Sequence, residues 1–372
     1  MRTVSLFTGI GGLELGFAKA VTSLKFVCES DTFASAVLHA RFPDVPIVPD
    51  VRSVDRLGRN VDLLLAGFPC QDVSSVGPKH GLTGTKTSLV TVVLDLLRRD
   101  RVPYVVLENV PFMLHLANGE VLRHILAELE RLHYDWAYRI VDAQSFVPQR
   151  RRRLFIVATQ TGEAARILLT HGSASSEPRQ LSLAEPIGFY WTEGTYATGL
   201  SPNSVPALKP GSTIGIPSPP AIHFPDGFLG TPDIRDAERL QGFSPGWTKP
   251  AEQVGRASHR WRLVGNAVAV PVARWLARRI AAPPRERTFQ HSPFPTSTFP
   301  PAAFGDQHGR FAVARSAQLQ RPSQELEGFL RFELRPLSAR ATKGFIERAR
   351  RGTMRFPDGF LESLDRHSRG VP

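Results

Sequence analysis

The sequence predicts an α/β fold, in which helices cover both faces of a parallel β-sheet, followed by a smaller second domain that is rich in loops. In the first half of the chain, short apolar runs alternate with amphipathic stretches, which is typical of βαβ units. In the second half this alternation ends in a segment that is rich in proline. Sheets of the predicted kind bind their ligands at the carboxyl ends of the strands.

Five apolar runs in the first half have the length of buried strands. We expect these strands at residues 4–7, 26–28, 63–66, 105–107 and 154–158. Apolar residues at helical spacing lie between the runs and predict helices at residues 34–41, 89–99 and 121–132. Residues 1–162 should therefore form one domain that carries the ligand site.

The next part of the chain has a different composition. Residues 202–232 contain eight prolines with scattered Gly and Ser, which excludes long helices and central strands. We expect residues 163–230 to form the loop-rich second domain. Helical spacing returns at residues 232–240 and 267–280, so residues 231–282 should return the chain to the first domain.

The C-terminal part begins with six prolines in residues 283–301, which predict an extended linker. A basic amphipathic helix is expected at residues 337–351, with Arg340, Lys343, Arg348, Arg350 and Arg351 on its polar surface. A solvated face is favoured over a DNA contact for this helix. The role of residues 283–372 stays open.

Composition narrows the class of protein. The 372 residues carry a formal net charge of +12, which is typical of a protein that binds a polyanion, although a generally basic soluble protein remains an alternative. No apolar run reaches the roughly 20 residues of a membrane span, so we expect a soluble, cytoplasmic protein. The two cysteines, Cys28 and Cys70, should be free thiols, and no His/Cys cluster has the spacing of a metal site.

A glycine loop follows the first expected strand. Residues 7–12 read Phe-Thr-Gly-Ile-Gly-Gly, and Glu29 follows the next strand. Glycines let the backbone approach a nucleotide-like cofactor, and the acidic residue can bind ribose hydroxyls. Glu14 stands where a dinucleotide fingerprint has its third glycine, which disfavours a nicotinamide cofactor. A tight structural turn is the alternative interpretation.

Two reactive side chains follow the next two strands. Cys70 lies within Gly-Phe-Pro-Cys-Gln-Asp, just beyond residues 63–66, where a nucleophile is expected. Most free cysteines are buried and inert, which is the alternative for this residue. Glu108 follows residues 105–107 and should emerge at the same sheet edge, so it could serve as an acid partner.

Four consecutive arginines run into the last strand, at residues 150–153. Such a run is often solvated or binds phosphates without sequence preference. In a strand, however, alternation would turn Arg151 and Arg153 to one face and Arg150 and Arg152 to the other. We expect one of these pairs to face the active site.

In their order from residue 4 to about residue 280, these motifs resemble those of the DNA (cytosine-5)-methyltransferase family. The chain is similar to the family in its glycine loop, its Pro-Cys-Gln nucleophile loop at residues 69–71 and its Glu-Asn-Val motif at 108–110. It is also similar in the Gln-x-Arg-x-Arg strand at 149–153, the hinge motif at 235–243 and the closing motif at 265–268. Ser5, Leu263 and Ala269 stand where the family frequently has Asp, Gln and Pro.

The resemblance implies a Rossmann-like sheet that binds S-adenosylmethionine, with a small target-recognition domain at residues 163–230. It implies that Cys70 adds to C6 of a flipped cytosine, that Glu108 holds a proton toward N3, that Arg153 contacts O2 and that Arg151 braces the nucleotide. A loop at residues 72–84 is expected to close over the base.

The cofactor residues also follow from the resemblance. Phe7 would lie against adenine, Gly9 and Gly11 near the methionine portion, and Glu29 on the ribose. Asp50 would accept a hydrogen bond from the adenine amino group, and Asn266 and Val268 would close the pocket.

The expected partner is double-stranded DNA, with a cognate restriction endonuclease as a candidate partner and a monomeric state. The rival functions are a tRNA cytosine-5 methyltransferase and a noncatalytic DNA-binding derivative of the fold.

Overall fold

In the computed structural model, the chain folds into two compact units. Unit 1 consists of Met1–Asp142, Arg152–Ser176 and Val272–Leu319, and unit 2 of Ala143–Arg151, Glu177–Pro271 and Gln320–Pro372. The structure describes residues 1–18, 23–69, 89–170, 181–193, 199–211, 218–285, 290–295, 298–315, 317, 319 and 324–370. The units depart from the expected domain boundaries, because residues 163–170 belong to unit 1 and the C-terminal extension is shared between both units.

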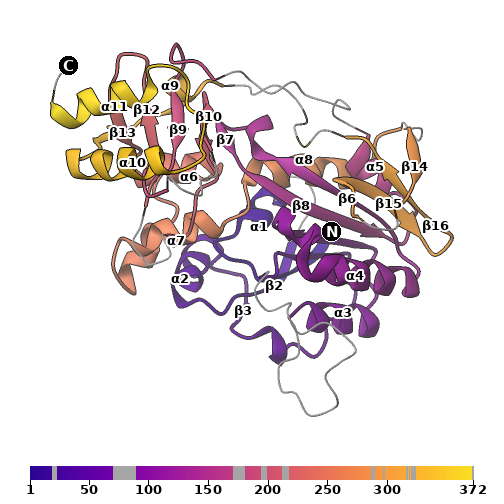
Figure 1. Cartoon of the computed structure of the whole chain (residues 1–372). Coiled ribbons are helices and arrows are strands. Elements are labelled where there is room, and N and C mark those ends of the chain that lie inside the picture. Colours follow the sequence, from indigo (N-terminus) through magenta and orange to yellow (C-terminus); the bar gives the residue numbers. More distant parts are fainter. Residues whose placement is uncertain are drawn as a thin grey trace. The chain divides into compact units, whose positions relative to one another are not determined.

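Unit 1 is built on a ten-stranded sheet with the order β14-β16-β15-β6-β8-β5-β4-β1-β2-β3 (Figure 1). The strands that had been expected are β1 (Arg2–Leu6), β2 (Ser23–Cys28), β4 (Leu63–Ala66), β5 (Tyr104–Asn109) and β8 (Arg152–Thr159). The further strands of the first half are β3 (Ile47–Val48) and β6 (Asp135–Asp142).

The prediction of a wholly parallel sheet is wrong. The strands β3, β2, β1, β4 and β5 pair in parallel, but β8 is antiparallel to both β5 and β6. The connection from β6 to β8 spans only residues 143–151 and contains no crossover helix, which a parallel pair would need. The sheet is therefore mixed.

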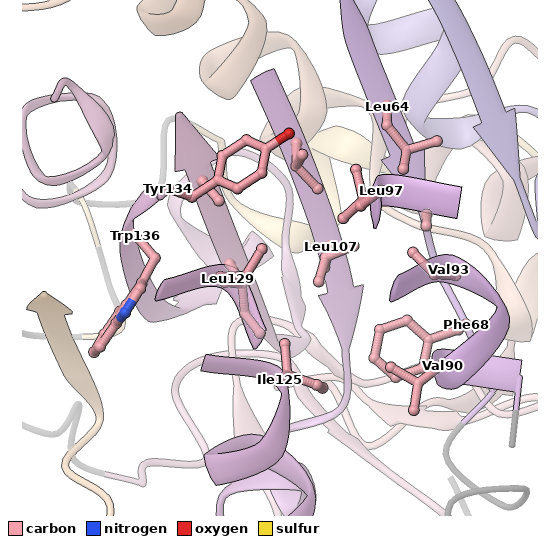
Figure 2. Close-up of a cluster of buried hydrophobic side chains, with 14 of the residues drawn as sticks. Leu64, Phe68, Val90, Val93, Leu97, Leu107, Ile125, Leu129, Tyr134 and Trp136 are labelled. Atoms are coloured by element: carbon pink, nitrogen blue, oxygen red, sulfur yellow. The ribbon is translucent and has the colours of Figure 1, made fainter. Parts of the chain in front are cut away.

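Helices α3 (Leu89–Arg99) and α4 (Glu120–Arg131) pack side by side on one face of this sheet. Both helices had been expected, and both have a strongly apolar face. Figure 2 shows how their side chains interlock with those of β4, β5 and β6, with Val90, Val93, Leu97, Ile125 and Leu129 from the helices and Leu64, Leu107 and Trp136 from the strands. Phe68, just beyond β4, closes one end of this cluster.

A second group of helices includes α1 (Gly12–Phe17), α2 (Thr32–Arg41), α5 (Ala164–Leu169) and α8 (Val270–Ala281). A side chain at Gly16 of α1 would collide with Ala273 of α8, so this close helix contact requires glycine. Arg279 of α8 donates to the carbonyl oxygen of Ile167 in α5. The expected helix start at Ala267 is wrong, because Ala267 has extended dihedral angles (φ −65°, ψ 149°) and ends α7 (His259–Asn266).

The C-terminal extension adds three strands to unit 1. Strands β14 (His291–Pro293), β15 (Ala302–Asp306) and β16 (Gly309–Val313) form an antiparallel meander, and β15 pairs with β6. The expected linker at residues 283–301 therefore contains a strand. Its proline is tolerated because β14 is an edge strand, where one side of the backbone needs no ladder partner.

Unit 2 contains a five-stranded sheet, β10-β9-β12-β13-β17, and a parallel pair, β11-β7. Its strands have only two or three residues, as the proline content suggests. They are β7 (Gln149–Arg150), β9 (Ile187–Phe189), β10 (Ser201–Pro202), β11 (Val205–Pro206), β12 (Ala221–His223), β13 (Leu229–Thr231) and β17 (Arg335–Pro336).

The helices of unit 2 are α6 (Ile234–Leu240), α7, α9 (Leu326–Phe329), α10 (Ala339–Arg351) and α11 (Phe360–Arg369). The expected C-terminal basic helix is thus confirmed as α10. Within the described parts of the chain, no helix is long and apolar enough to cross a lipid bilayer.

Candidate active site

The candidate site lies along the carboxyl edge of the five parallel strands of unit 1. Leu6 of β1 pairs with Cys28 of β2 and with Ala66 of β4, and Ala66 pairs with Leu107 of β5. The residues that come next on the four strands are Phe7, Glu29, Gly67 and Glu108. The register therefore brings the glycine loop, the acidic residue and the start of the cysteine loop to one line. This is the edge at which such sheets bind ligands.

The glycine loop turns through unusual backbone conformations. Phe7, Gly9 and Gly11 all have positive φ angles of 58°, 59° and 87°. Glu29 holds this turn, because its carboxylate accepts hydrogen bonds from the backbone N–H groups of Gly9 and Asp31, each at 2.7 Å. Burial raises the pKa of Glu29, and the two N–H donors oppose this shift.

Glu14 lies fully buried directly behind this loop. Its Oε1 accepts a hydrogen bond from Ser5, and its Oε2 is buried without a hydrogen-bond partner. Burial raises the pKa of Glu14 to about 7, an effect that the Ser5 hydroxyl partly offsets. In the sequence, Glu14 stands out only as a departure from the dinucleotide fingerprint, and no local pattern predicts its pairing with Ser5.

Asn109 fixes the start of the cysteine loop. Its side-chain Nδ2 donates to the carbonyl oxygen of Phe68 at 3.0 Å, and its Oδ1 accepts from the N–H of Val110. A Cβ at Gly67 would lie 3.5 Å from Oε2 of Glu108, so the carboxyl group lies directly over this loop. Cys70 and the expected closing loop at residues 72–84 lie outside the described residues.

Arg153 is the arginine that meets Glu108. Its Nε lies 3.2 Å from Oε1 of Glu108, and both side chains are mostly buried. Burial lowers the pKa of Arg153, while the charge of Glu108 raises it. The pair places a carboxyl group and a guanidinium group next to each other at the sheet edge.

The expectation that Arg151 and Arg153 share one strand face is wrong. Strand β7 ends at Arg150 and β8 begins at Arg152, so the alternation is interrupted at Arg151. Arg151 belongs to unit 2, where its buried guanidinium donates to the carbonyl oxygens of Leu208, Gly265 and Ala267. Arg152 is exposed, and Arg150 donates to the carbonyl oxygen of Leu200.

Three of the sequence motifs meet in unit 2 through buried amide groups. Gln149 donates to the carbonyl oxygen of Leu240 at 2.8 Å, and its Oε1 accepts from the N–H of Leu208 at 2.9 Å. Gln241 in turn donates to the carbonyl oxygen of Val264. This network fixes the C-terminal end of α7, where Asn266 is exposed, and Val268 just beyond it is half-buried.

Asp50 and Cys28 both belong to unit 1. Asp50 follows β3 and is exposed, and its Oδ1 accepts from the N–H of Arg52. Cys28, the last residue of β2, is buried, and burial together with Glu29 and Asp50 raises its pKa to about 12. Both effects disfavour the thiolate form of Cys28.

Comparisons with known proteins identify the family. A family model described as C-5 cytosine-specific DNA methylase matches residues 1–193. The chain is 39% identical to the Type II methyltransferase M2.BsuMI of Bacillus subtilis, over 98% of both chains. It is 27% identical to the Type II methyltransferase M.DsaV of Dactylococcopsis salina, over 75% of this chain and 86% of the relative.

Solved structures show the same fold at low sequence identity. The S. pombe Dnmt2 methyltransferase aligns with a TM-score of 0.53 at 14% identity, over 76% of this chain and 97% of that one. The Entamoeba histolytica methyltransferase EhMeth aligns with a TM-score of 0.52 at 16% identity, over 74% and 96%. Both likenesses support the Rossmann-like methyltransferase sheet.

Proposed function

The chain belongs to the C-5 cytosine-specific DNA methylase family, and from this premise we propose that it methylates C5 of a flipped cytosine in duplex DNA through a covalent adduct with Cys70. The observation that carries this proposal is the row of Phe7, Glu29, Gly67 and Glu108 along one sheet edge. It brings the candidate cofactor loop to the candidate base-binding residues.

Cys70 supplies the nucleophile. C5 of cytosine is a poor nucleophile, so the thiolate first adds to C6 and the electron pair makes C5 enamine-like. C5 would then take the methyl group that S-adenosylmethionine supplies, with the donor leaving as a neutral thioether, and transfer of the C5 proton to a base would expel the thiolate and restore the aromatic ring. Asn109 supports this step, because it fixes Phe68 two residues before Cys70 in the sequence.

Glu108 and Arg153 recognise the cytosine ring. N3 and O2 are adjacent atoms of cytosine, and the neighbouring carboxyl and guanidinium groups match this pair. A protonated Glu108 would donate to N3 as the thiolate adds, while Arg153 donates to O2. The ion pair must open for Glu108 to face N3, so the arriving base would draw Arg153 toward O2.

The glycine loop fits S-adenosylmethionine, which supplies an electrophilic sulfonium methyl group. Within the described residues, a Cβ at Gly9 would meet no atom within 4 Å, so the loop faces open space. Glu29 already holds the loop through Gly9 and keeps acceptor capacity for ribose hydroxyls. Phe7, Gly11 and Asp50 would complete the adenosine contacts in unit 1, and Asn266 and Val268 are the proposed residues from unit 2.

Unit 2 is proposed to read the DNA sequence, because it contains the proline-rich segment at residues 202–232 and short strands joined by loops. Arg151 positions the C-terminal end of α7 in place of bracing the flipped nucleotide. A restriction endonuclease of the same host, from which the methylation would protect DNA, is the proposed functional partner. Monomeric action in the cytoplasm is also part of this proposal.

Bisulfite sequencing of plasmid DNA from cells that express the protein tests this function. Methylated cytosines at one short sequence are expected, together with their absence in cells that express Cys70→Ser. Methylation of tRNA by the purified protein, with unmodified plasmid DNA, would point to the rival substrate.

A further inference from the structure

The C-terminal segment, defined here as residues 324–370, completes the core of unit 2. One cluster of buried residues contains Ile187, Phe189, Leu200, Ala221 and Leu229 from the central sheet strands and their loops. The same cluster contains Leu337, Phe345, Ile346, Ala349, Phe360 and Leu364 from the C-terminal segment. The Phe189 ring packs against those of Phe345 and Phe360, at centroid distances of 4.8 and 5.4 Å. About half of this core therefore comes from the last part of the chain.

Polar contacts fix the segment at several points of the unit. Asp236 of α6, which is fully buried, accepts hydrogen bonds from the N–H groups of Arg331 and Phe332. Strand β17 pairs with β13, and His223 of β12 contacts the Ser363 hydroxyl at 2.8 Å. The segment is thus an integral part of unit 2.

Arg348 connects α10 to the loop that follows β9. Its Nη2 donates to the carbonyl oxygen of Trp191 at 2.7 Å, and its Nε donates to that of Glu193 at 3.2 Å. The other four basic residues that had been expected on this helix, Arg340, Lys343, Arg350 and Arg351, are exposed. Arg348 differs from these four residues because it is half-buried and donates hydrogen bonds to two backbone carbonyl groups.

Side chains of the loop that Arg348 holds contact Lys209 in unit 2. Glu193 forms an ion pair with Lys209, and the Lys209 ammonium group lies 4.4 Å from the centre of the Tyr190 ring. The Lys209 backbone packs so closely on Gly265 that a side chain there would collide with it. The contacts of α10 with this loop therefore continue to Lys209 within unit 2.

We propose that Arg348 is a positioning residue for sequence recognition, which holds the loop at residues 190–193 in the conformation that contacts the target DNA. This inference rests on the proposed function, in which unit 2 reads the sequence. It makes the C-terminal segment part of the specificity machinery, although no family motif marks it. Arg348 acts through the two carbonyl groups and does not itself touch DNA.

The test compares Arg348→Ala, Arg348→Lys and Arg350→Ala in the full-length protein. The measurements are kcat/KM on the target duplex and on duplexes with one altered base pair, together with the Kd of S-adenosylmethionine. Loss of two charge-assisted hydrogen bonds should lower the selectivity of R348A by about tenfold or more. The cofactor Kd should stay unchanged, R348K should recover part of the selectivity, and R350A should stay within about twofold of wild type.

Wild-type selectivity in folded R348A would overturn the inference. Equal losses in R348A and R350A would also overturn it, since they would indicate a general charge effect. If R348A does not fold by circular dichroism, R348K decides, because it keeps the charge but cannot donate to both carbonyl groups in the fork geometry of arginine. A wild-type protein that methylates no DNA would defeat the proposed function itself, which is a separate outcome.

Discussion

Nε of Arg153 lies 3.2 Å from the carboxyl group of Glu108, and the two residues come from the antiparallel neighbours β8 and β5. This ion pair joins two neighbouring strands, and in the proposed mechanism an arriving cytosine separates the two side chains.

Glu108→Gln should lower the single-turnover methylation rate by about 10² to 10⁴, because an amide cannot transfer a proton to N3. The Kd of S-adenosylmethionine should stay unchanged, since Glu29 and the glycine loop lie on other strands. Glu120→Gln, at an exposed position of α4, is the control. Near-normal turnover in Glu108→Gln would exclude the assigned role.

Asn109→Asp should slow covalent adduct formation, because it removes the donor to Phe68 and keeps an acceptor for the Val110 N–H. The free energy of unfolding should fall by about 1–3 kcal/mol, since the buried hydrogen bond is lost. The measurement is the rate of trapping on duplex DNA that carries 5-fluorocytosine. Trapping at the wild-type rate by a folded variant would contradict the role of Asn109.

Cys28 provides a matched control for the proposed nucleophile, Cys70. Cys70→Ser should abolish methylation and trapping on 5-fluorocytosine DNA, because a hydroxyl group is far less ionised than a thiol near neutral pH. Cys28→Ser should keep both activities, since burial already raises the pKa of Cys28 to about 12. Denaturing gels report the adduct. An adduct on Cys70→Ser, or its loss in Cys28→Ser alone, would exclude the mechanism.

Glu14 should make stability depend on pH. Its pKa rises from 4.5 in the unfolded chain to about 7, so the folded state binds more protons between these values. The free energy of unfolding should therefore fall as the pH rises through this range. Glu14→Gln should remove this dependence and be more stable than wild type at about pH 8, by roughly 2–4 kcal/mol.

Urea unfolding at several pH values measures this effect, with Glu120→Gln as the exposed control. Parallel pH profiles for wild type and Glu14→Gln would show that Glu14 is not the responsible group.

Exchange of residues 177–231 with the equivalent segment of a related enzyme should move the methylated site. The exchange should give more active enzyme when residues 324–370 are exchanged with it, because the two segments share one core. Bisulfite sequencing identifies the site. An active chimera with the original site would show that sequence recognition lies elsewhere.

The parallel half of the sheet and its edge could be predicted because the information is local. The apolar runs at residues 63–66 and 105–107 form strands, and the motif residues follow each strand directly. The antiparallel position of β8 depends on β6, in which Asp135, Arg139 and Asp142 interrupt the apolar residues of a strand that is buried along nearly its whole length.

Arg151 shows the other limit of local reasoning. Four identical residues suggested regular alternation, but a break of one residue between β7 and β8 directs Arg151 to carbonyl groups more than 50 residues away in the sequence. Glu14 and Asn109 were missed because their partners, a serine and a carbonyl group, leave no pattern of their own.

The shared core of unit 2 has a consequence for synthesis on the ribosome. The strands at residues 187–231 are synthesised long before Phe345 and Phe360. Their apolar face therefore stays uncovered until the end of the chain has been made. Contacts of such sequence separation slow folding, and unfinished apolar sheets are prone to aggregate. A late stop codon that removes α10 and α11 should therefore yield insoluble protein, although every motif of the active site has already been translated.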